Sequence, residues 1–328
     1  MREPEEILEP DLPICDPHHH LWDHPGSRYL IEELVADTGS GHRIESTVFV
    51  ECMAFYRADG PEALRPVGET EFVNGVAAMS ASGRYGAMRA CAGIVGYADL
   101  TLGAGVDGVL EAHLRAGGGR FRGIRHAGGW DESEAVRDSH TNPPKGLYGS
   151  AAFREGYARL AAYGLSFEAW QYHPQLPEVT ALARAFPDIP LVLDHVGGPL
   201  GIGPYEGRRT EVFAQWKADL ADLAACPNVV VKLGGLGMPI CGFGFHKREI
   251  LPDSVELAEA WRPYIETCIE LFGAERCMFE SNFPVDRASC DYATLWNAFK
   301  RIAAGASPAE KALLFRDVAR RTYRLEGE

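Results

Sequence analysis

The chain has 328 residues, 46% hydrophobic and 24% charged, which is enough apolar material for one large core and lies within the size range of a single α/β barrel. Its formal net charge of −14 repels phosphate backbones and anionic lipid surfaces, which argues against nucleic acid and membrane partners. The first residues are acidic and no run reaches the roughly 18 apolar residues of a membrane span, so we expect a cytoplasmic protein.

Eight short apolar runs recur along the chain and are typical of strands buried on both faces. They are residues 12–15, 47–50, 90–95, 121–124, 165–169, 190–193, 229–233 and 277–279. The segments between them carry apolar residues at helical spacing, and a capping box at Ser307 starts the last helix. Strands that alternate with amphipathic helices imply right-handed crossovers and a parallel sheet, and eight such units close a single (β/α)8 barrel domain over residues 1–328.

An open doubly wound sheet is the alternative architecture, but no glycine-rich phosphate-binding signature follows the first predicted strand. Residues 56–74, 128–148 and 197–209 are rich in Gly, Pro or charge and are expected to form long loops over the barrel mouth, where substrates bind. The eight cysteines are dispersed along the chain, so we expect them to be reduced and mostly structural.

The strongest local signal is the run Asp16-Pro-His-His-His-Leu-Trp22, directly after the first predicted strand. Residues two apart in an extended segment point the same way, so His18 and His20 can present imidazoles to one centre while His19 points elsewhere. Paired neutral imidazoles suit Zn²⁺ or a similar divalent ion. The alternative interpretation is a solvated histidine cluster at the end of a strand.

Two more histidines fall at the ends of other predicted strands, His173 after residues 167–172 and His195 after residues 191–194. The carboxyl ends of barrel strands form the functional face, so we expect these side chains near His18 and His20 as metal ligands or catalytic groups. For His195 the competing role is a proton shuttle or an oxyanion donor. For His173 it is a hydrogen-bonded wall residue.

With these residues the sequence resembles the amidohydrolase superfamily, and specifically the amidohydrolase-2 group of sugar-acid lactonases, pyrone-dicarboxylate lactonase and related decarboxylases. The segments that carry the resemblance are DPHHHLW at 16–22, FRGIRH at 121–126, YHPQLP at 172–177, LVLDHVGGP at 191–199, VVVKLGGLG at 229–237 and CMFESNFPVD at 277–286. The resemblance implies that His18 and His20 are the first-strand metal ligands, with His173 and His195 at the fifth-strand and sixth-strand positions. It also implies at most one divalent metal ion, with Zn²⁺ first in line, because the fourth-strand lysine that bridges two metals in some relatives is missing; some lactonases of the group work without a metal.

The sequence departs from that family after the eighth predicted strand. Where relatives usually carry an aspartate that accepts a proton or binds the metal, this chain has Asn282, which can coordinate or orient a group but cannot act as a base. Glu280 shares its facing, Asp286 lies just beyond, and either carboxylate is a candidate for the missing base. An ion pair with a barrel arginine is the alternative for Glu280.

Basic side chains near the predicted strand ends indicate an anionic substrate. Arg122, Arg125 and Lys232 are expected at the mouth with His246 on a following loop, and guanidinium groups suit carboxylates. The alternative is that these cations neutralise buried carboxylates in structural pairs; the candidates are Glu51, Glu168, Asp194 and Glu280. Trp22 is expected to line the substrate site. The loop carboxylates Glu69 and Glu71 could reach it, and the alternative is that they lie on a solvated loop face.

The sequence therefore predicts a hydrolase that opens a small, carboxylate-bearing lactone or cyclic ester with a metal-activated water. The alternatives are a metal-dependent decarboxylase of an aromatic or unsaturated acid and a barrel that binds a small acid without turnover. The expected partner is a small organic acid or lactone, and association of the chain with copies of itself is left open.

Overall fold

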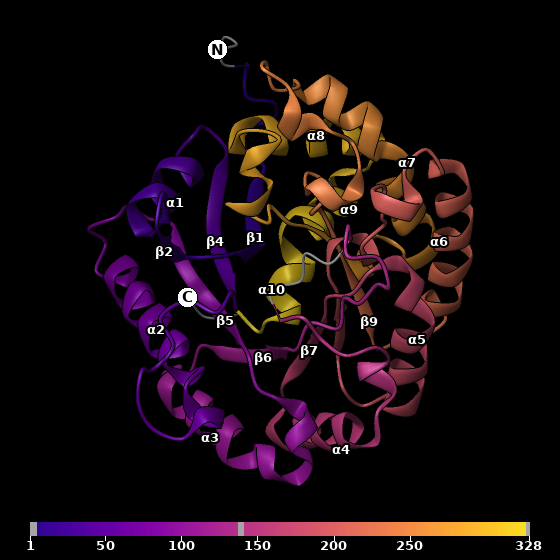
Figure 1. Ribbon diagram of the computed structural model, residues 1–328. Helices are drawn as coiled ribbons and strands as arrows, with labels where there is room; N and C mark the ends of the chain where they lie inside the picture. The colour runs from indigo at the N-terminus through magenta and orange to yellow at the C-terminus, as the bar shows by residue number, and fades with distance from the viewer. Residues whose placement is uncertain (1–4, 137–140, 326–328) are drawn as a thin grey trace.

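The computed structural model describes residues 5–136 and 141–325, and its centre is a barrel of eight parallel strands surrounded by helices (Figure 1). The barrel strands in spatial order are β1 (Pro13–His19), β4 (Arg43–Val50), β5 (Arg89–Gly96), β6 (Phe121–Arg125), β7 (Ser166–Ala169), β8 (Leu191–Leu193), β9 (Val229–Leu233) and β10 (Cys277–Phe279). Each of the eight predicted runs is a strand of this barrel, so the predicted (β/α)8 fold is confirmed.

The first and last strands meet through the motifs that follow them. The Asn282 N–H donates to the His18 carbonyl at 2.9 Å, and the His20 N–H donates to the Phe283 carbonyl at 2.8 Å. These two bonds complete the ring between β1 and β10, and they bring the histidine motif directly beside the asparagine motif.

The outer layer consists of helices, with a final short helix at one end of the barrel. The helices are α1 (Ile31–Thr38), α2 (Val67–Ala81), α3 (Asp107–Ala116), α4 (Ala151–Arg159), α5 (Leu176–Ala185), α6 (Arg209–Ala224), α7 (Ser254–Phe272), α8 (Tyr292–Ile302), α9 (Pro308–Ala312) and α10 (Val318–Thr322). Ser307 caps α9 as predicted, since its side chain accepts the Glu310 N–H, and a π-helical turn joins α9 to α10. None of the helices in the described ranges combines the length and the apolar character that a bilayer crossing requires.

Part of the loop prediction is wrong. Residues 67–74 form the first half of α2, where Gly68 packs so closely on the backbone of Phe55 and Arg57 that a Cβ atom would lie 2.7 Å from it. This glycine serves close packing, not a turn. A short hairpin of β2 (Trp22–His24) and β3 (Ser27–Tyr29) was not predicted, and residues 137–140 of the second expected loop lie outside the described residues.

The barrel interior begins with an apolar layer at the amino-terminal side. Cys15, Val48, Val192 and Met278 are fully buried there and pack against the C-terminal segment 318–325. Figure 1 shows α10 of this segment inside the ring of outer helices. The segment closes one end of the barrel, so access to the interior is from the carboxyl ends of the strands.

Candidate active site

Charged side chains fill the barrel directly above the apolar layer. Residues two apart on a strand share a facing, so Asp194 follows inward Val192 and Glu280 follows inward Met278. Lys232 projects inward from β9 in the same way, and all three charged groups are fully buried. On these strands, two positions separate an inward apolar side chain from an inward charged one, so an apolar layer is followed directly by a charged layer.

The histidine motif leaves β1 with two rings turned toward one centre. The Nε2 atoms of His18 and His20 lie 3.3 Å apart, while His19 turns away to the Thr47 hydroxyl at 2.9 Å. His20 Nδ1 lies 2.8 Å from the Val50 carbonyl, which fixes the ring and leaves its Nε2 as an acceptor. Burial lowers the pKa of both His18 and His20, so both rings are neutral at pH 7 and are competent ligands.

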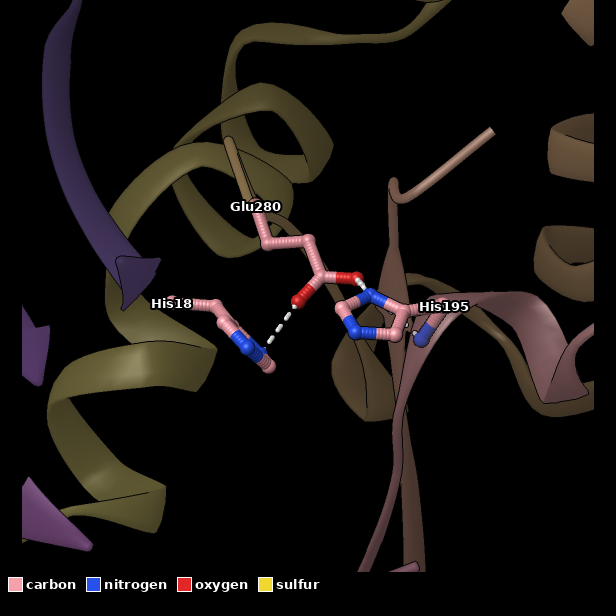
Figure 2. Close-up of side chains that lie close together, drawn as sticks. All are labelled: His18, His195 and Glu280. Carbon is pink, nitrogen blue, oxygen red and sulfur yellow. Dashed lines mark hydrogen bonds and ion pairs between the residues drawn. The ribbon is translucent and has the colours of Figure 1, made fainter. Parts of the chain in front are cut away.

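Glu280 joins His18 to His195. Figure 2 shows its carboxylate between the two rings, with Oε2 2.9 Å from His18 Nδ1 and Oε1 2.7 Å from His195 Nδ1. Oε1 also accepts the His195 backbone N–H at 3.1 Å. Burial alone would raise the pKa of Glu280, but the two imidazoles outweigh it and lower the pKa to about 2. Glu280 is therefore an ionised group that orients His195.

Two glycines of the β9 motif make this approach possible. A Cβ atom at Gly234 would lie 2.5 Å from Glu280 Cγ, and one at Gly235 would lie 2.5 Å from His195 Cγ. Gly235 also has a φ of +67°, a conformation that L side chains rarely adopt. The pair of glycines in VVVKLGGLG thus leaves room for the Glu280–His195 pair.

His195 and Asn282 are themselves held in left-handed backbone conformations, each with a φ of 54°. Such conformations are strained for residues other than glycine, and they persist where the surroundings determine them fully. Glu280 holds the His195 N–H and the His18 carbonyl holds the Asn282 N–H. Both strained residues line the same pocket.

Lys232 is the centre of a second charged group. Its Nζ lies 3.0 Å from His18 Nδ1 and 3.2 Å from Asp194 Oδ1, and it donates to Glu168. The Tyr323 hydroxyl donates to the other oxygen of Glu168. Burial would lower the pKa of Lys232, but the charges of Asp194 and Glu168 raise it, so the ammonium stays charged.

Arg125 supplies the remaining fixed cation. Its Nε donates to Glu51 at 2.6 Å, and its Nη1 lies 3.5 Å from Asp194 and 3.4 Å from His18 Nε2. The guanidinium is buried but still reaches the pocket wall. Arg125 and Lys232 therefore both neutralise buried carboxylates, which was the alternative interpretation of these cations.

A pocket of about 300 Å³ opens over this layer. We call it the central pocket; its lining residues are His20, Trp22, His24, Cys52, Arg125, Trp170, His195, Met238, Pro239, Ile240, Asn282 and Val285. Trp170 meets His195 edge-on with ring centroids 4.8 Å apart. The pocket thus combines one fixed cation, several imidazoles and an amide with flat aromatic walls, which suits a small polar ring.

The remaining polar groups of the last motif support the pocket from behind. Asn282 Nδ2 donates to Asp286 Oδ1 at 2.8 Å, and the Gly237 N–H donates to Asp286 Oδ2 at 2.9 Å. Burial raises the pKa of Asp286 to about 7. Asp16 accepts the Ser281 N–H at 3.0 Å, so it ties the first motif to the last.

Three of the residues expected at the mouth lie elsewhere. Arg122 donates to the Tyr323 and Gly119 carbonyls at the amino-terminal side of β6, so its expected place at the mouth is wrong. His246 lines a neighbouring hollow with Lys247, not the central pocket. His173 Nδ1 accepts the Leu200 N–H at 3.3 Å and belongs to neither group of potential metal ligands among the described residues.

Of the two interpretations of Glu69 and Glu71, a place in the substrate site is wrong. Glu69 lies on α2, where it is buried and accepts the N–H groups of Cys52 and Ala54. Glu71 pairs with Arg57 at the surface. Neither side chain lines the central pocket.

Trp170 lines the central pocket and was not predicted from the sequence. Glu51, Glu168 and Asp194 neutralise Arg125 and Lys232 as the alternative predicted, and they also lie directly beneath the pocket. For Asp194 the alternation along the strand held the signal, because it lies two positions after inward Val192 and must share its facing.

Two overlapping groups of side chains could hold a divalent ion. The first cation position is formed by His18, His195 and Glu280, and the second by His18, Glu168 and Asp194. Within the described residues, Glu280 Oε2 and Asp194 Oδ1 are buried without a hydrogen bond of good geometry, although cationic or ring nitrogens lie near both. Neutral imidazoles beside under-satisfied carboxylate oxygens fit a divalent metal.

Comparison with known proteins identifies the class. The family described as Amidohydrolase matches residues 15–325, so the chain belongs to the amidohydrolase family. An uncharacterized protein of Sinorhizobium fredii, y4mH, is 33% identical over 96% of this chain and 99% of its own length.

Two further relatives are similar at greater distance. An L-fucono-1,5-lactonase of Burkholderia multivorans is 28% identical over 71% of this chain and 72% of its own length. An amidohydrolase crystal structure from Burkholderia multivorans with bound zinc has a TM-score of 0.72 and 24% identity, and it covers 95% of this chain and 99% of the other.

Proposed function

We propose that this protein hydrolyses a small lactone, with His195 as the proton carrier in the central pocket. The observation that carries the proposal is the Glu280–His195 pair, in which Glu280 Oε1 lies 2.7 Å from His195 Nδ1. With Nδ1 committed to a carboxylate, the other ring nitrogen is left to accept a proton from water. The lactonase relative from Burkholderia multivorans supports a cyclic ester as the substrate.

The proposed reaction uses the groups of the pocket in order. His195 takes a proton from water as the water oxygen adds to the lactone carbonyl carbon. Arg125, fixed by Glu51, and the Asn282 amide lie at the pocket wall, where they can stabilise the negative charge that develops on the carbonyl oxygen. The ring C–O bond then breaks, and the leaving oxygen takes the proton back from His195, which yields the open hydroxy acid.

A divalent ion, with Zn²⁺ as the first choice, would be held by His18 and Glu280, and His195 lies within reach of the same position. When bound, the ion would polarise the carbonyl or lower the pKa of a water molecule. The zinc found in the structural relative supports this assignment. Neutral His18 and ionised Glu280 are already in the protonation states that a ligand needs.

The substrate's own charge stays a prediction. Arg125 and Lys232 each have carboxylate partners within the protein, so the charge of neither cation requires a substrate carboxylate to neutralise it. Trp22 and Trp170 offer flat apolar faces beside polar groups, which favours a ring that carries hydroxyl groups. We therefore place lactones of sugar acids first and carboxylate-bearing lactones second.

A panel of lactones tests the proposal. Purified protein is mixed with neutral sugar-acid lactones and with a pyrone dicarboxylate, and ring opening is followed by proton release; aromatic acids are assayed in parallel for released CO₂. Ring opening that is lost in His195→Gln supports the proposal. Release of CO₂ without ring opening identifies a decarboxylase, and saturable binding without turnover of any compound identifies a binding protein; either result overturns it.

A further inference from the structure

The ammonium group of Lys232 lies among side chains that could themselves bind a metal ion. Its Nζ contacts His18 Nδ1, Asp194 Oδ1 and Glu168 Oε2, and these three side chains are the second cation position. The ammonium donates to Glu168, forms an ion pair with Asp194 and lies within hydrogen-bond distance of His18 Nδ1. One imidazole and two carboxylates are also an ordinary ligand set for a divalent metal.

The second cation position is rigidly held and sealed from water. His18, Glu168, Asp194 and Lys232 are all fully buried. The Tyr323 hydroxyl holds the far oxygen of Glu168, and Arg125 Nη1 lies 3.5 Å from Asp194 Oδ2. Without a cation at its centre, this group would leave two buried carboxylates without the positive charge that their burial requires.

The two cation positions share His18. Its Nδ1 lies 2.9 Å from Glu280 in the first position and 3.0 Å from Lys232 in the second. A divalent ion at the second position would need the ammonium to leave, because the two cations would occupy the same buried place and like charges that close repel strongly.

We propose that Lys232 is a tethered cation that replaces a second metal ion, so that the protein holds one exchangeable divalent ion, at the first cation position. The inference rests on the metal of the proposed function, and it assigns Lys232 as the residue that sets the metal stoichiometry. Lys232 acts on the reaction through His18 and is a positioning residue.

Metal stoichiometry tests the inference without an activity assay. Wild type, Lys232→Met and Lys232→Arg are each saturated with Mn²⁺, freed of excess ion, and analysed for bound metal and for electron paramagnetic resonance. We expect one ion in wild type and in Lys232→Arg, and two ions in Lys232→Met, the second held chiefly by Glu168 and Asp194 because one imidazole nitrogen cannot ligate two ions. The double variant Lys232→Met/Glu168→Gln, which lacks one ligand of the second position, should return to one ion.

The count is read as a difference from wild type. Wild type without bound metal speaks against the metal of the proposed function, while a gain of one ion in Lys232→Met still supports the role of Lys232. Equal counts in wild type and Lys232→Met, or two ions in the double variant, overturn the inference. If Lys232→Met is soluble only when expressed with Mn²⁺, the inference is supported, since the ion then replaces the lost charge. If it is soluble under neither condition, saturated wild type decides: two ions overturn the inference, and one ion in both wild type and Lys232→Arg supports it.

Discussion

The apolar layer and the charged layer of the barrel interior are built from the same strands but have different effects on the protein. Val192 and Met278 belong to the apolar layer that packs on residues 318–325, and Asp194 and Glu280, two positions later, belong to the charged layer under the pocket. The apolar layer gains free energy from burial, whereas a layer of buried charges at best breaks even. We infer that the first layer stabilises the fold and that the second is maintained for chemistry.

The largest expected effect is in the charged layer, on catalysis. His195→Gln should lower kcat by about 10³-fold, or about 4 kcal/mol, because it removes the proton carrier while the fold stays intact. Steady-state kinetics on the best lactone of the panel measures this. His246→Gln, in the neighbouring hollow, is the matched control and should change kcat little. Activity within tenfold of wild type would contradict the assignment, and parallel loss of bound metal would make His195 a ligand.

The apolar layer should show the reverse pattern. Met278→Ala is expected to lower the free energy of unfolding by about 3 kcal/mol, because it leaves a cavity against the C-terminal segment, while kcat of the folded fraction stays near wild type. Urea denaturation measures the change. Met79→Ala is the control, since Met79 is 42% exposed. A large fall in kcat without loss of stability would remove the distinction between the layers.

Glu280→Gln tests whether the charged layer assists catalysis through the contact between Glu280 and His195. The amide keeps the shape but loses the charge that orients His195, so kcat should fall by about 10²-fold, or about 2.7 kcal/mol, with a modest change in KM. Glu275→Gln, an exposed change just before the amino end of β10, is the control. An unchanged kcat would show that His195 needs no partner.

The smallest expected effect is a pH dependence behind the pocket. Asn282→Asp places a second carboxylate 2.8 Å from Asp286, whose pKa is already raised to about 7 by burial. The pair must keep a proton, so the folded-state pKa rises above the unfolded one, and its stabilisation is full at low pH and is lost as pH rises through 7. Between pH 7 and 8 the variant should lose about 1 kcal/mol more unfolding free energy than wild type. The exchange Asn282→Asp/Asp286→Asn keeps one carboxylate and should behave like wild type; an identical pH slope in the single variant would contradict the prediction.

The sequence predicted the fold well because every barrel strand is a short run of apolar residues between amphipathic segments. It also predicted that His18, His20, His195 and Glu280 come together, since each follows directly on a strand end. The prediction was wrong where the position of a side chain along the barrel axis decides whether it reaches the pocket. Arg122 and Arg125 lie three positions apart on β6, which places them about 10 Å apart and on opposite faces, so only Arg125 can reach the pocket.

His173 shows a different limit of prediction. It lies four residues beyond the end of β7, where the chain has already turned and its ring faces Leu200 and Tyr205. Loop direction depends on contacts between distant segments, which no local pattern in the sequence encodes.

The bond between Tyr323 and Glu168 also bears on how the protein is made. Glu168 precedes its partner by 155 positions, and Asp16 precedes its partner Tyr292 by 276. A chain that grows from its amino terminus therefore leaves Glu168, Asp194 and the apolar layer exposed until residues 318–325 have been made. The ribosome must release residues 318–325 before either layer can close. We expect chains arrested before this segment to be recognised as unfinished, by chaperones or proteases, while their histidines and carboxylates are still in water.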